Sequence, residues 1–261
     1  MLSVVIPAYN ERERLGQGLA EVLAFLNRHT PDFELIIVDD GSQDGMADVV
    51  RAAIALEPRA RLITYKANRG KGYAVRTGVL DSHGDPVIFM DADLSTPLSE
   101  IPRILERLAV SGADIVIGSR GLPEADIRQK PPLGRRIASR IFDEIKHALV
   151  GLRGLHDTQC GFKAFRGNVA RRLFDLSRVD RFMFDVEILY LAERAGLSIV
   201  EFPVAWADMP GSKVRFLEGV INMFRDLWRI RRMHPGEIVV ERENSRRATD
   251  EERQASGITR Q

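Results

Sequence analysis

The sequence predicts an α/β fold with a mostly parallel, Rossmann-like central sheet covered by helices on both faces. Short apolar runs with the length and composition of buried strands lie at residues 3–7, 33–38, 61–65, 86–90 and 114–117. Amphipathic stretches typical of helices lie between them, at residues 15–26, 47–56, 73–80 and 98–110. Thr96 and Pro97 are suited to begin the last of these helices. Strands that alternate with helices favour a parallel sheet, which binds ligands at the carboxyl ends of its strands.

The second half of the chain has a different organisation. We expect a helix at 133–149, a turn-like segment at 157–165, a helix at 184–195 and a strand at 198–204. Residues 214–233 combine large apolar side chains with arginines in a long amphipathic helical pattern. From residue 234 the chain is polar and charged, and we expect it to be disordered. The predicted parts are therefore a main domain at 1–213, an amphipathic helix at 214–233 and a tail at 234–261.

Composition excludes several classes of function. A formal charge of +1 over 261 residues gives no overall reason to expect nucleic-acid binding. Cys160 is the single cysteine, so the chain cannot form an internal disulfide or a cysteine-based zinc cluster, and we expect a buried apolar residue. The apolar run at 3–7 follows the N-terminus directly, so we expect no signal peptide. No stretch approaches the ~18 apolar residues of a spanning helix, so we expect any membrane contact to be peripheral.

Two aspartates directly follow the predicted strand at 86–90. Residues two apart in an extended chain point the same way, so Asp91 and Asp93 can converge at the mouth of the sheet. Two carboxylates at such a short distance repel each other unless a cation lies between them. Mg²⁺ or Mn²⁺ bridging a diphosphate would remove that cost. A turn that only introduces the next helix explains an isolated pair of this kind equally well.

Polar loops follow the first three predicted strands, with the sequences PAYNE (7–11), VDDGS (38–42) and NRGKG (68–72). Because these strand ends meet at one edge, the loops can offer acceptors for a base and a ribose, and amides for phosphate. Arg69 and Lys71 add positive charge there. Each loop alone is more often a simple connection, but their coincidence with the two aspartates favours a nucleotide site.

Together these segments resemble the family 2 glycosyltransferases, in particular the dolichyl- or polyprenyl-phosphate glucosyltransferases and mannosyltransferases. The similarity runs from about residue 3 to residue 213 and rests on VVIPAYNE, IIVDDGS, NRGKGYAVRTGVL, FMDADLS, VIGSR, DTQCGFKAF, FDVEILYLA and GSK. DTQCGFKAF, FDVEILYLA and Trp206 before GSK look more like the glucose-transferring branch. The resemblance implies a GT-A type fold with 1–213 as the catalytic domain, and it favours UDP-glucose over GDP-mannose as donor.

The resemblance also implies roles for individual residues. Donor binding falls to Pro7, Tyr9, Glu11, Asp39, Asp40, Arg69, Lys71, Ala92 and Lys213. The metal and diphosphate site falls to Asp91 and Asp93, although Ser95 stands where some mannose-transferring relatives have a glutamine. Arg120, Arg136 and Ser139 resemble an acceptor-phosphate clamp, which makes Asp91, Asp93 and Arg120 the candidate catalytic residues.

The acceptor implied by the resemblance is polyprenyl or dolichyl phosphate. Its ionised phosphate can attack the anomeric carbon without a general base, and one in-line displacement inverts the linkage. Asp185 and Glu187 can bind sugar hydroxyls or pair locally, and we favour a structural role for Glu187. The 214–233 helix can rest on an anionic membrane, dock on the core or pair with a second copy in a homo-oligomer. We expect a cytoplasmic protein, peripheral on the cytoplasmic face of a membrane.

Two other functions fit the same residues. A GT-A enzyme that glycosylates a soluble or polysaccharide acceptor would keep the three loops but would not need a membrane-facing helix. A nucleotide-sugar-binding protein without turnover would also keep the loops, although the intact Asp91 and Asp93 argue against it.

Overall fold

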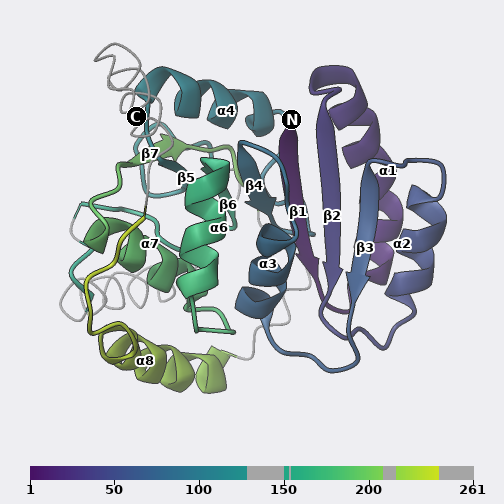
Figure 1. The fold of residues 1–261 in the computed structure, drawn as a ribbon. Coiled ribbons are helices and arrows are strands. Elements are labelled where there is room, and N and C mark those ends of the chain that lie inside the picture. The colour runs from purple at the N-terminus through teal and green to yellow at the C-terminus, as the bar shows by residue number, and fades with distance from the viewer. Residues whose placement is uncertain (128–149, 153, 208–215, 241–261) are drawn as a thin grey trace, which may run out of the picture.

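The computed structural model describes residues 1–127, 150–152, 154–207 and 216–240. Within these residues seven strands form one sheet in the order β3-β2-β1-β4-β6-β5-β7 (Figure 1). The strands are β1 (Leu2–Ala8), β2 (Phe33–Asp39), β3 (Ala60–Thr64), β4 (Val87–Met90), β5 (Ile115–Ser119), β6 (Phe162–Phe165) and β7 (Ile199–Pro203). All neighbours pair in parallel except β6, which is antiparallel to both β4 and β5. The predicted mostly parallel sheet is confirmed.

Helices cover both faces of this sheet (Figure 1). One face packs on α1 (Arg12–His29), α2 (Met46–Ile54) and α4 (Glu100–Ser111). The other packs on α3 (Lys71–Leu80), α6 (Gly167–Leu176) and α7 (Phe184–Arg194), and α8 (Phe216–Met233) packs against α7. β1, β2, β4 and β5 are buried along their whole lengths because helices cover both sides, which explains their continuous apolar sequences.

Two local expectations were wrong. The segment 157–165 is not all turn, because Phe162–Phe165 forms β6 between β4 and β5. The lysine at the second position of this four-residue strand interrupts the apolar run that would have predicted it. The α4 helix begins after Ser99 rather than at Thr96 and Pro97, which lie in the preceding loop. Sequence analysis also missed α6, whose arginines obscure the apolar face formed by Val169, Leu173 and Phe174.

The start of the predicted tail packs against the core. His234 is buried, and its Nε2 lies 2.7 Å from Oε1 of Glu187, which is itself fully buried in α7. Arg194 donates hydrogen bonds to the backbone carbonyls of His234 and Gly236. Disorder from residue 234 onwards is therefore wrong for 234–240. The expected helix at 133–149, Arg136, Ser139, Lys213 and the tail after residue 240 lie outside the described residues.

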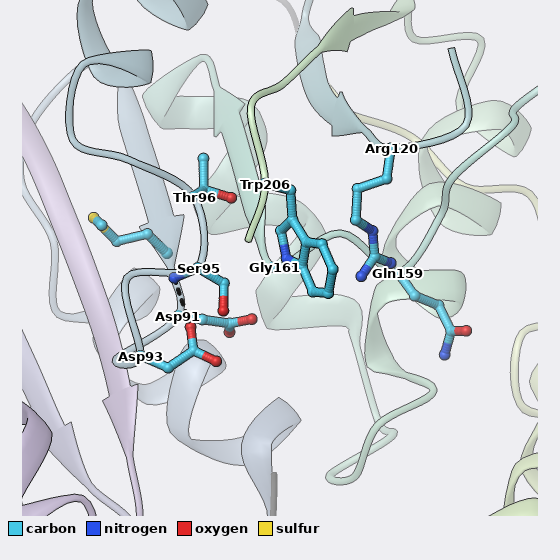
Figure 2. A pocket seen from close by; sticks show the side chains of 9 residues that line it. Asp91, Asp93, Ser95, Thr96, Arg120, Gln159, Gly161 and Trp206 are labelled. Carbon is cyan, nitrogen blue, oxygen red and sulfur yellow. Dashed lines mark hydrogen bonds between the residues drawn. The ribbon is translucent and has the colours of Figure 1, made fainter. Parts of the chain in front are cut away.

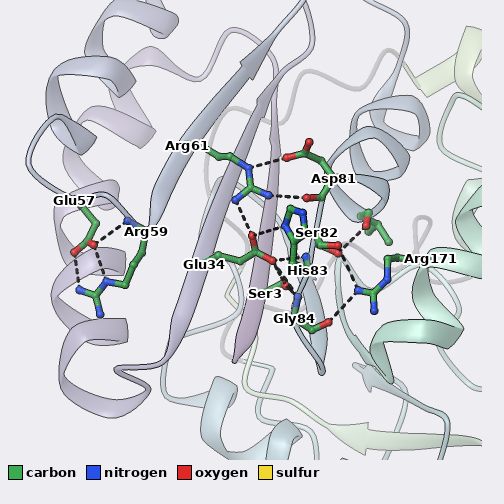
Figure 3. A network of polar contacts seen from close by, with 11 residues as sticks. Ser3, Glu34, Glu57, Arg59, Arg61, Asp81, Ser82, His83, Gly84 and Arg171 are labelled. Atoms are coloured by element: carbon green, nitrogen blue, oxygen red, sulfur yellow. Dashed lines mark hydrogen bonds and ion pairs between the residues drawn. The ribbon is translucent and has the colours of Figure 1, made fainter. Parts of the chain in front are cut away.

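A polar network joins the amino-terminal ends of neighbouring strands, at the opposite end of the sheet from the polar loops (Figure 3). Glu34, at the start of β2, accepts hydrogen bonds from the Ser3 hydroxyl at 2.5 Å and from the backbone amides of His83 and Gly84. Arg61 of β3 lies 2.6 Å from both Glu34 and Asp81. Burial tends to raise the pKa of Glu34, but these hydrogen bonds and Arg61 lower it to about 2. The network fixes the starts of three strands with a paired, buried charge.

Candidate functional site

The loops after β1 and β2 are bound to each other. The Asn10 amide donates to the Ser42 hydroxyl at 2.8 Å, and the Gln43 amide donates to the Asn10 side chain at 2.9 Å. Asn10 has a φ of 54°, a left-handed conformation that asparagine tolerates well. Asp39 accepts the Ser42 amide at 2.8 Å. The PAYNE and VDDGS segments therefore form one cross-linked unit, as expected from their positions at adjacent strand ends.

The loop after β3 is held by Asp40, which is 3 % exposed. The Asp40 carboxylate accepts hydrogen bonds from the Tyr65 hydroxyl, the Asn68 side chain and the amides of Arg69 and Gly70, at 2.7 to 2.8 Å. Burial, followed by the hydrogen bond to Asp40 and the Asp40 charge, raises the pKa of Tyr65, so the phenol stays a donor. Asp40 therefore holds the NRGKG loop in its conformation, and its part in donor binding stays a prediction.

Four other predicted donor residues, Pro7, Tyr9, Glu11 and Arg69, lie in or next to these loops but differ in access. Pro7 is buried within β1, whereas Tyr9 is 40 % exposed. Glu11 precedes α1 and pairs with Arg14 at 3.0 Å. The Arg69 guanidinium lies 3.6 Å from the ring centroid of Tyr73. Tyr9 thus offers an accessible aromatic surface, while Glu11 is already engaged with its helix.

Asp91 begins the loop after β4 and has two supports. Its Oδ1 lies 2.6 Å from Nζ of Lys71, at the start of α3, and its amide donates to the Gly161 carbonyl at 3.1 Å. A Cβ at Gly161 would lie 1.9 Å from Oδ2 of Asp91, so this carboxylate needs a glycine beside it. Burial tends to lower the pKa of Lys71, but Asp91, Asp185 and Asp93 raise it, so the ammonium stays charged.

Asp93 lies in a turn that is hydrogen-bonded to the segment containing Trp206 and Ala207. The Asp93 Oδ1 accepts the Ser95 amide at 2.9 Å, and the Ser95 carbonyl accepts the Ala207 amide at 3.0 Å. Asp91, Asp93, Arg120 and Trp206 line one pocket together with Met90, Ser95, Thr96, Gln159 and Gly161. In Figure 2 the two aspartates lie on one side, Arg120 and Gln159 on the other, and the Trp206 ring between them.

Arg120 is held at this pocket by Asp157. Its Nε and Nη2 donate to the two Asp157 oxygens at 2.6 and 3.1 Å, and its amide also donates to that carboxylate. Its guanidinium lies 5.4 Å from the Trp206 ring centroid. Burial tends to raise the pKa of Asp157, but Arg120 holds it below its ordinary value. Sequence analysis named Arg120 but missed Asp157, whose position in DTQCGFKAF was the available signal.

A buried ion pair lies behind the same site. Lys163 of β6 is 1 % exposed, and its Nζ donates to Asp185 Oδ1 at 2.5 Å and to the Cys160 carbonyl at 2.6 Å. Burial raises the pKa of Asp185 despite the nearby lysines. Cys160 is buried as expected, and burial raises the pKa of its thiol to about 12. Glu187 accepts the amides of Arg178 and Val179, which agrees with its expected structural role.

The carboxylates at this pocket that could hold a metal ion are Asp91 and Asp93. Among the residues that the structure describes, no group of three or more His, Cys, Asp or Glu side chains gathers to form a closed metal site. Mg²⁺ commonly binds through one or two carboxylates together with substrate phosphates. Two carboxylates that line one open pocket therefore fit an ion shared with a diphosphate.

The α8 helix docks on the core through its inner side. Leu227 and Ile230 are buried in the cluster formed with α3, α6 and α7. Trp228 is 53 % exposed, with the Arg232 guanidinium 3.5 Å from its ring centroid, and Arg229 is also exposed. No helix in the described part of the chain is long and apolar enough to cross a bilayer.

Comparison with known proteins finds relatives that align with most of this chain. The chain is 39 % identical over 241 residues to a dolichyl-phosphate beta-glucosyltransferase of Dictyostelium discoideum, covering 88 % of this chain and 73 % of the relative. It is 41 % identical to the Drosophila melanogaster protein of that name, covering 88 % and 74 %. The human protein of that name is 34 % identical, with the same coverage.

The fold is also found in solved structures. Glucosyl-3-phosphoglycerate synthase from Mycobacterium tuberculosis, in complex with Mn²⁺, UDP and phosphoglyceric acid, aligns with a TM-score of 0.62 at 21 % identity. The alignment covers 88 % of this chain and 76 % of the synthase, so the GT-A type fold is confirmed. The glycosyl transferase family 2 model matches residues 3–174. The chain therefore belongs to glycosyl transferase family 2.

Proposed function

We propose that this chain transfers glucose from UDP-glucose to dolichyl phosphate, with inversion at the anomeric carbon. The observation that carries the proposal is one pocket in which the Asp91 and Asp93 carboxylates lie across from the Arg120 guanidinium. Carboxylates suit a cation bound to a diphosphate, and a guanidinium suits a phosphate oxyanion. Relatives named dolichyl-phosphate beta-glucosyltransferase, at 34 to 41 % identity, support the choice of sugar and acceptor.

We propose a divalent cation at the two aspartates. Structures of the Mycobacterium tuberculosis synthase with UDP include one complex with Mn²⁺ and one with Mg²⁺. In this chain Asp91 and Asp93 would hold the ion, which supplies charge neutralisation of the leaving diphosphate. Lys71, beside Asp91, adds a second positive charge at the same place. Ser95 contributes its amide to Asp93 and thereby holds the carboxylate that we assign to the ion.

The donor nucleotide is proposed to lie along the loops after β1, β2 and β3. Tyr9 offers an exposed ring, and Asp39 holds the VDDGS turn through the Ser42 amide. Arg69 and Lys71 place positive charge between these loops and the pocket. Pro7 and Ala92, whose side chains are buried, are proposed to meet the donor through their backbone. Lys213, from the sequence motif GSK, is proposed to close over the diphosphate.

The acceptor phosphate is proposed to bind at Arg120, with Arg136 and Ser139 completing the clamp. Asp157 holds the Arg120 fork in one orientation, which lowers the entropy lost when a phosphate binds. A phosphate that is ionised near neutral pH attacks without first losing a proton to a side chain. The residues therefore work by orienting the attacking oxygen and stabilising the leaving diphosphate.

The exposed side of α8 is proposed to contact the cytoplasmic face of a membrane. Trp228 with Arg229 and Arg232 combines an interfacial aromatic ring with positive charge, as expected for a helix at an anionic headgroup surface. Pairing of this side with a second copy is the alternative, and sedimentation of the purified protein tests it. Residues 1–213, 214–233 and 234–261 remain our proposed division of the chain.

Radiolabelled sugar transfer tests the proposed function. UDP-glucose and GDP-mannose are each offered with short-chain dolichyl phosphate, or with phosphoglyceric acid as a soluble phosphate acceptor, in Mg²⁺, Mn²⁺ or EDTA. We expect label from UDP-glucose in the lipid fraction, lost in EDTA. Label from GDP-mannose would overturn the choice of donor, and label in the soluble acceptor alone would overturn the lipid acceptor. A bilayer-vesicle flotation assay with and without anionic lipid tests the membrane contact separately.

A further inference from the structure

Both residues of the Lys163–Asp185 ion pair are almost fully buried. Lys163 is 1 % exposed and lies in the middle of the sheet, paired in register with Phe89 of β4 and Ile117 of β5. Asp185, in the first turn of α7, is 3 % exposed. Lysine is almost never fully buried without a partner, and here Asp185 and the Cys160 carbonyl are its partners.

One end of this pair controls a backbone turn that touches Asp91. Lys163 holds the carbonyl of Cys160, and the next residue, Gly161, accepts the Asp91 amide at 3.1 Å. A Cβ at position 161 would lie 1.9 Å from Asp91 Oδ2, so the carboxylate packs directly on this backbone. A displacement of the turn by even a few tenths of an ångström would therefore move the Asp91 carboxylate or open a gap beside it.

The other end supports the lysine that binds Asp91. The start of α7 packs on the start of α3 so closely that a Cβ at Gly72 would lie 2.5 Å from the Val179 carbonyl and 2.6 Å from Phe184 Cβ. Lys71, the neighbour of Gly72, lies 2.6 Å from Asp91 and 6.0 Å from the Phe184 ring centroid. Asp185 follows Phe184, so the ion pair joins β6 to the helix that supports Lys71.

Stability alone gives no reason for such a pair. Replacing a buried ion pair by apolar residues of similar volume is often neutral or stabilising, because desolvation offsets the attraction between the charges. A hydrogen-bonded ion pair has fixed directions, however, and apolar contacts do not. The pair therefore suits the task of holding a turn and a helix end in one relative position.

We propose that Lys163 and Asp185 are positioning residues for Asp91, acting through the Cys160–Gly161 turn and the start of α7. Neither residue is among those that line the pocket. The inference rests on the proposed function in one respect, since it takes Asp91 to hold the cation and diphosphate. Its structural part, the orientation of Asp91, can be measured without any substrate.

Hydrogen exchange gives the first test. In the double variant Lys163→Met/Asp185→Leu, apolar side chains replace the pair and keep the core filled. We expect faster exchange of the Asp91 amide, because its acceptor at Gly161 is no longer held, while β1 and β2 stay protected. Glu34→Gln is the matched control, since it disrupts a buried ion pair at the opposite edge of the sheet and should leave Asp91 unchanged. Wild-type exchange at Asp91 in the double variant would overturn the proposal.

Calorimetry of UDP binding gives the second test. We expect the gain in UDP affinity on adding Mn²⁺ to fall by about 10- to 100-fold in the double variant, the usual effect of removing a group that orients a metal ligand. The single variant Lys163→Arg, which keeps the positive charge, should retain part of the gain in UDP affinity on adding Mn²⁺. If the double variant does not fold, as judged by circular dichroism, Asp185→Asn carries the same test, because it keeps an acceptor for Lys163 but removes the charge. An unchanged response to Mn²⁺ in a folded variant would assign the pair to core stability alone.

These outcomes separate the positioning role from the proposed reaction. A wild-type protein that binds UDP with Mn²⁺ but transfers no glucose to dolichyl phosphate would overturn the acceptor and still allow both tests. Glucose transfer at the wild-type rate by the folded double variant would overturn the positioning role and leave the reaction standing.

Discussion

Lys71 reaches Asp91 from a different loop, and its Nζ lies 2.6 Å from the carboxylate Oδ1. The contact joins the NRGKG segment to the DAD segment, which are separate strand ends in the sequence. Because a lysine charge beside Asp91 reduces the repulsion between Asp91 and Asp93, the two carboxylates can share one pocket. The relationship makes Lys71 a central element of the proposed site.

Lys71→Met should lower the rate of glucose transfer by about 100-fold, an effect of the size found when one preorganised donor is removed from a charged transition state. The methionine keeps most of the packing against Phe184 but carries no charge. Steady-state kinetics with UDP-glucose measures the effect. Lys66→Met is the control, because Lys66 is exposed in the same loop region. Equal activity of the two variants would contradict a role for Lys71 in the site.

Asp93→Asn should abolish metal-dependent transfer and leave the fold intact. Asparagine keeps the Oδ1 that accepts the Ser95 amide at 2.9 Å, so the turn is retained while the anionic ligand is lost. Transfer assays over a range of Mn²⁺ concentrations, together with the thermal unfolding temperature, check both parts. Unchanged turnover at the wild-type Mn²⁺ requirement would remove Asp93 from the metal site.

Gly161→Ala should inactivate the enzyme through a purely steric effect. The new Cβ would lie 1.9 Å from Asp91 Oδ2, so the carboxylate must leave its position. We expect a loss of Mn²⁺-dependent UDP binding, measured by calorimetry. Gly236→Ala serves as control, since a Cβ there meets nothing within 4 Å. Retained binding in Gly161→Ala would show that Asp91 can serve from another position.

Arg120→Lys should raise the KM for the lipid phosphate more than the KM for UDP-glucose. Lysine keeps the charge but cannot reproduce the two-point contact with Asp157. The positive side chain at position 120 is then no longer held in the orientation that faces the acceptor phosphate. Arg103→Lys, in α4, is the control for a general effect of replacing an arginine. Equal changes in both KM values would place Arg120 outside the acceptor clamp.

Glu34→Gln should make stability less dependent on pH. The pKa of Glu34 is lowered from 4.5 to about 2 in the folded protein, so its charge stabilises the fold above pH 4.5. This contribution is lost as the pH falls from 4.5 towards 2, and by linkage it amounts to at most about 3 kcal/mol. Urea unfolding of both proteins between pH 3 and 7 measures it. A constant difference in unfolding free energy across that range would contradict the lowered pKa.

Charged residues limited what could be read from the pattern of the second half. Lys163 is buried because Asp185 neutralises it, but a lysine in a four-residue segment looks like part of a turn. The arginines of α6 hid its apolar face in the same way. Local pattern assigns charged residues to the surface, and a partner that lies 22 residues away along the chain, like Asp185, cannot be seen in it.

Proximity at a strand end also did not determine what each side chain contacts. Asp39 and Asp40 are adjacent in the sequence and both are buried, yet Asp39 binds the Ser42 amide of its own loop. Asp40 instead binds the loop after β3. Successive side chains of an extended segment point in opposite directions, so one residue of difference changes the neighbouring loop that each one meets.

The sequence by itself determined the alternation of strands and helices, the edge at which the polar loops gather, and the family to which the chain is similar. These follow from apolar periodicity and from motifs that are continuous in the chain. The tertiary structure decided that Lys71 binds Asp91, that Asp157 holds Arg120, and that Lys163 and Asp185 lie buried behind the pocket. Such pairs join distant segments, and their energies depend on burial and direction, which exist only after the sheet and its helices have packed.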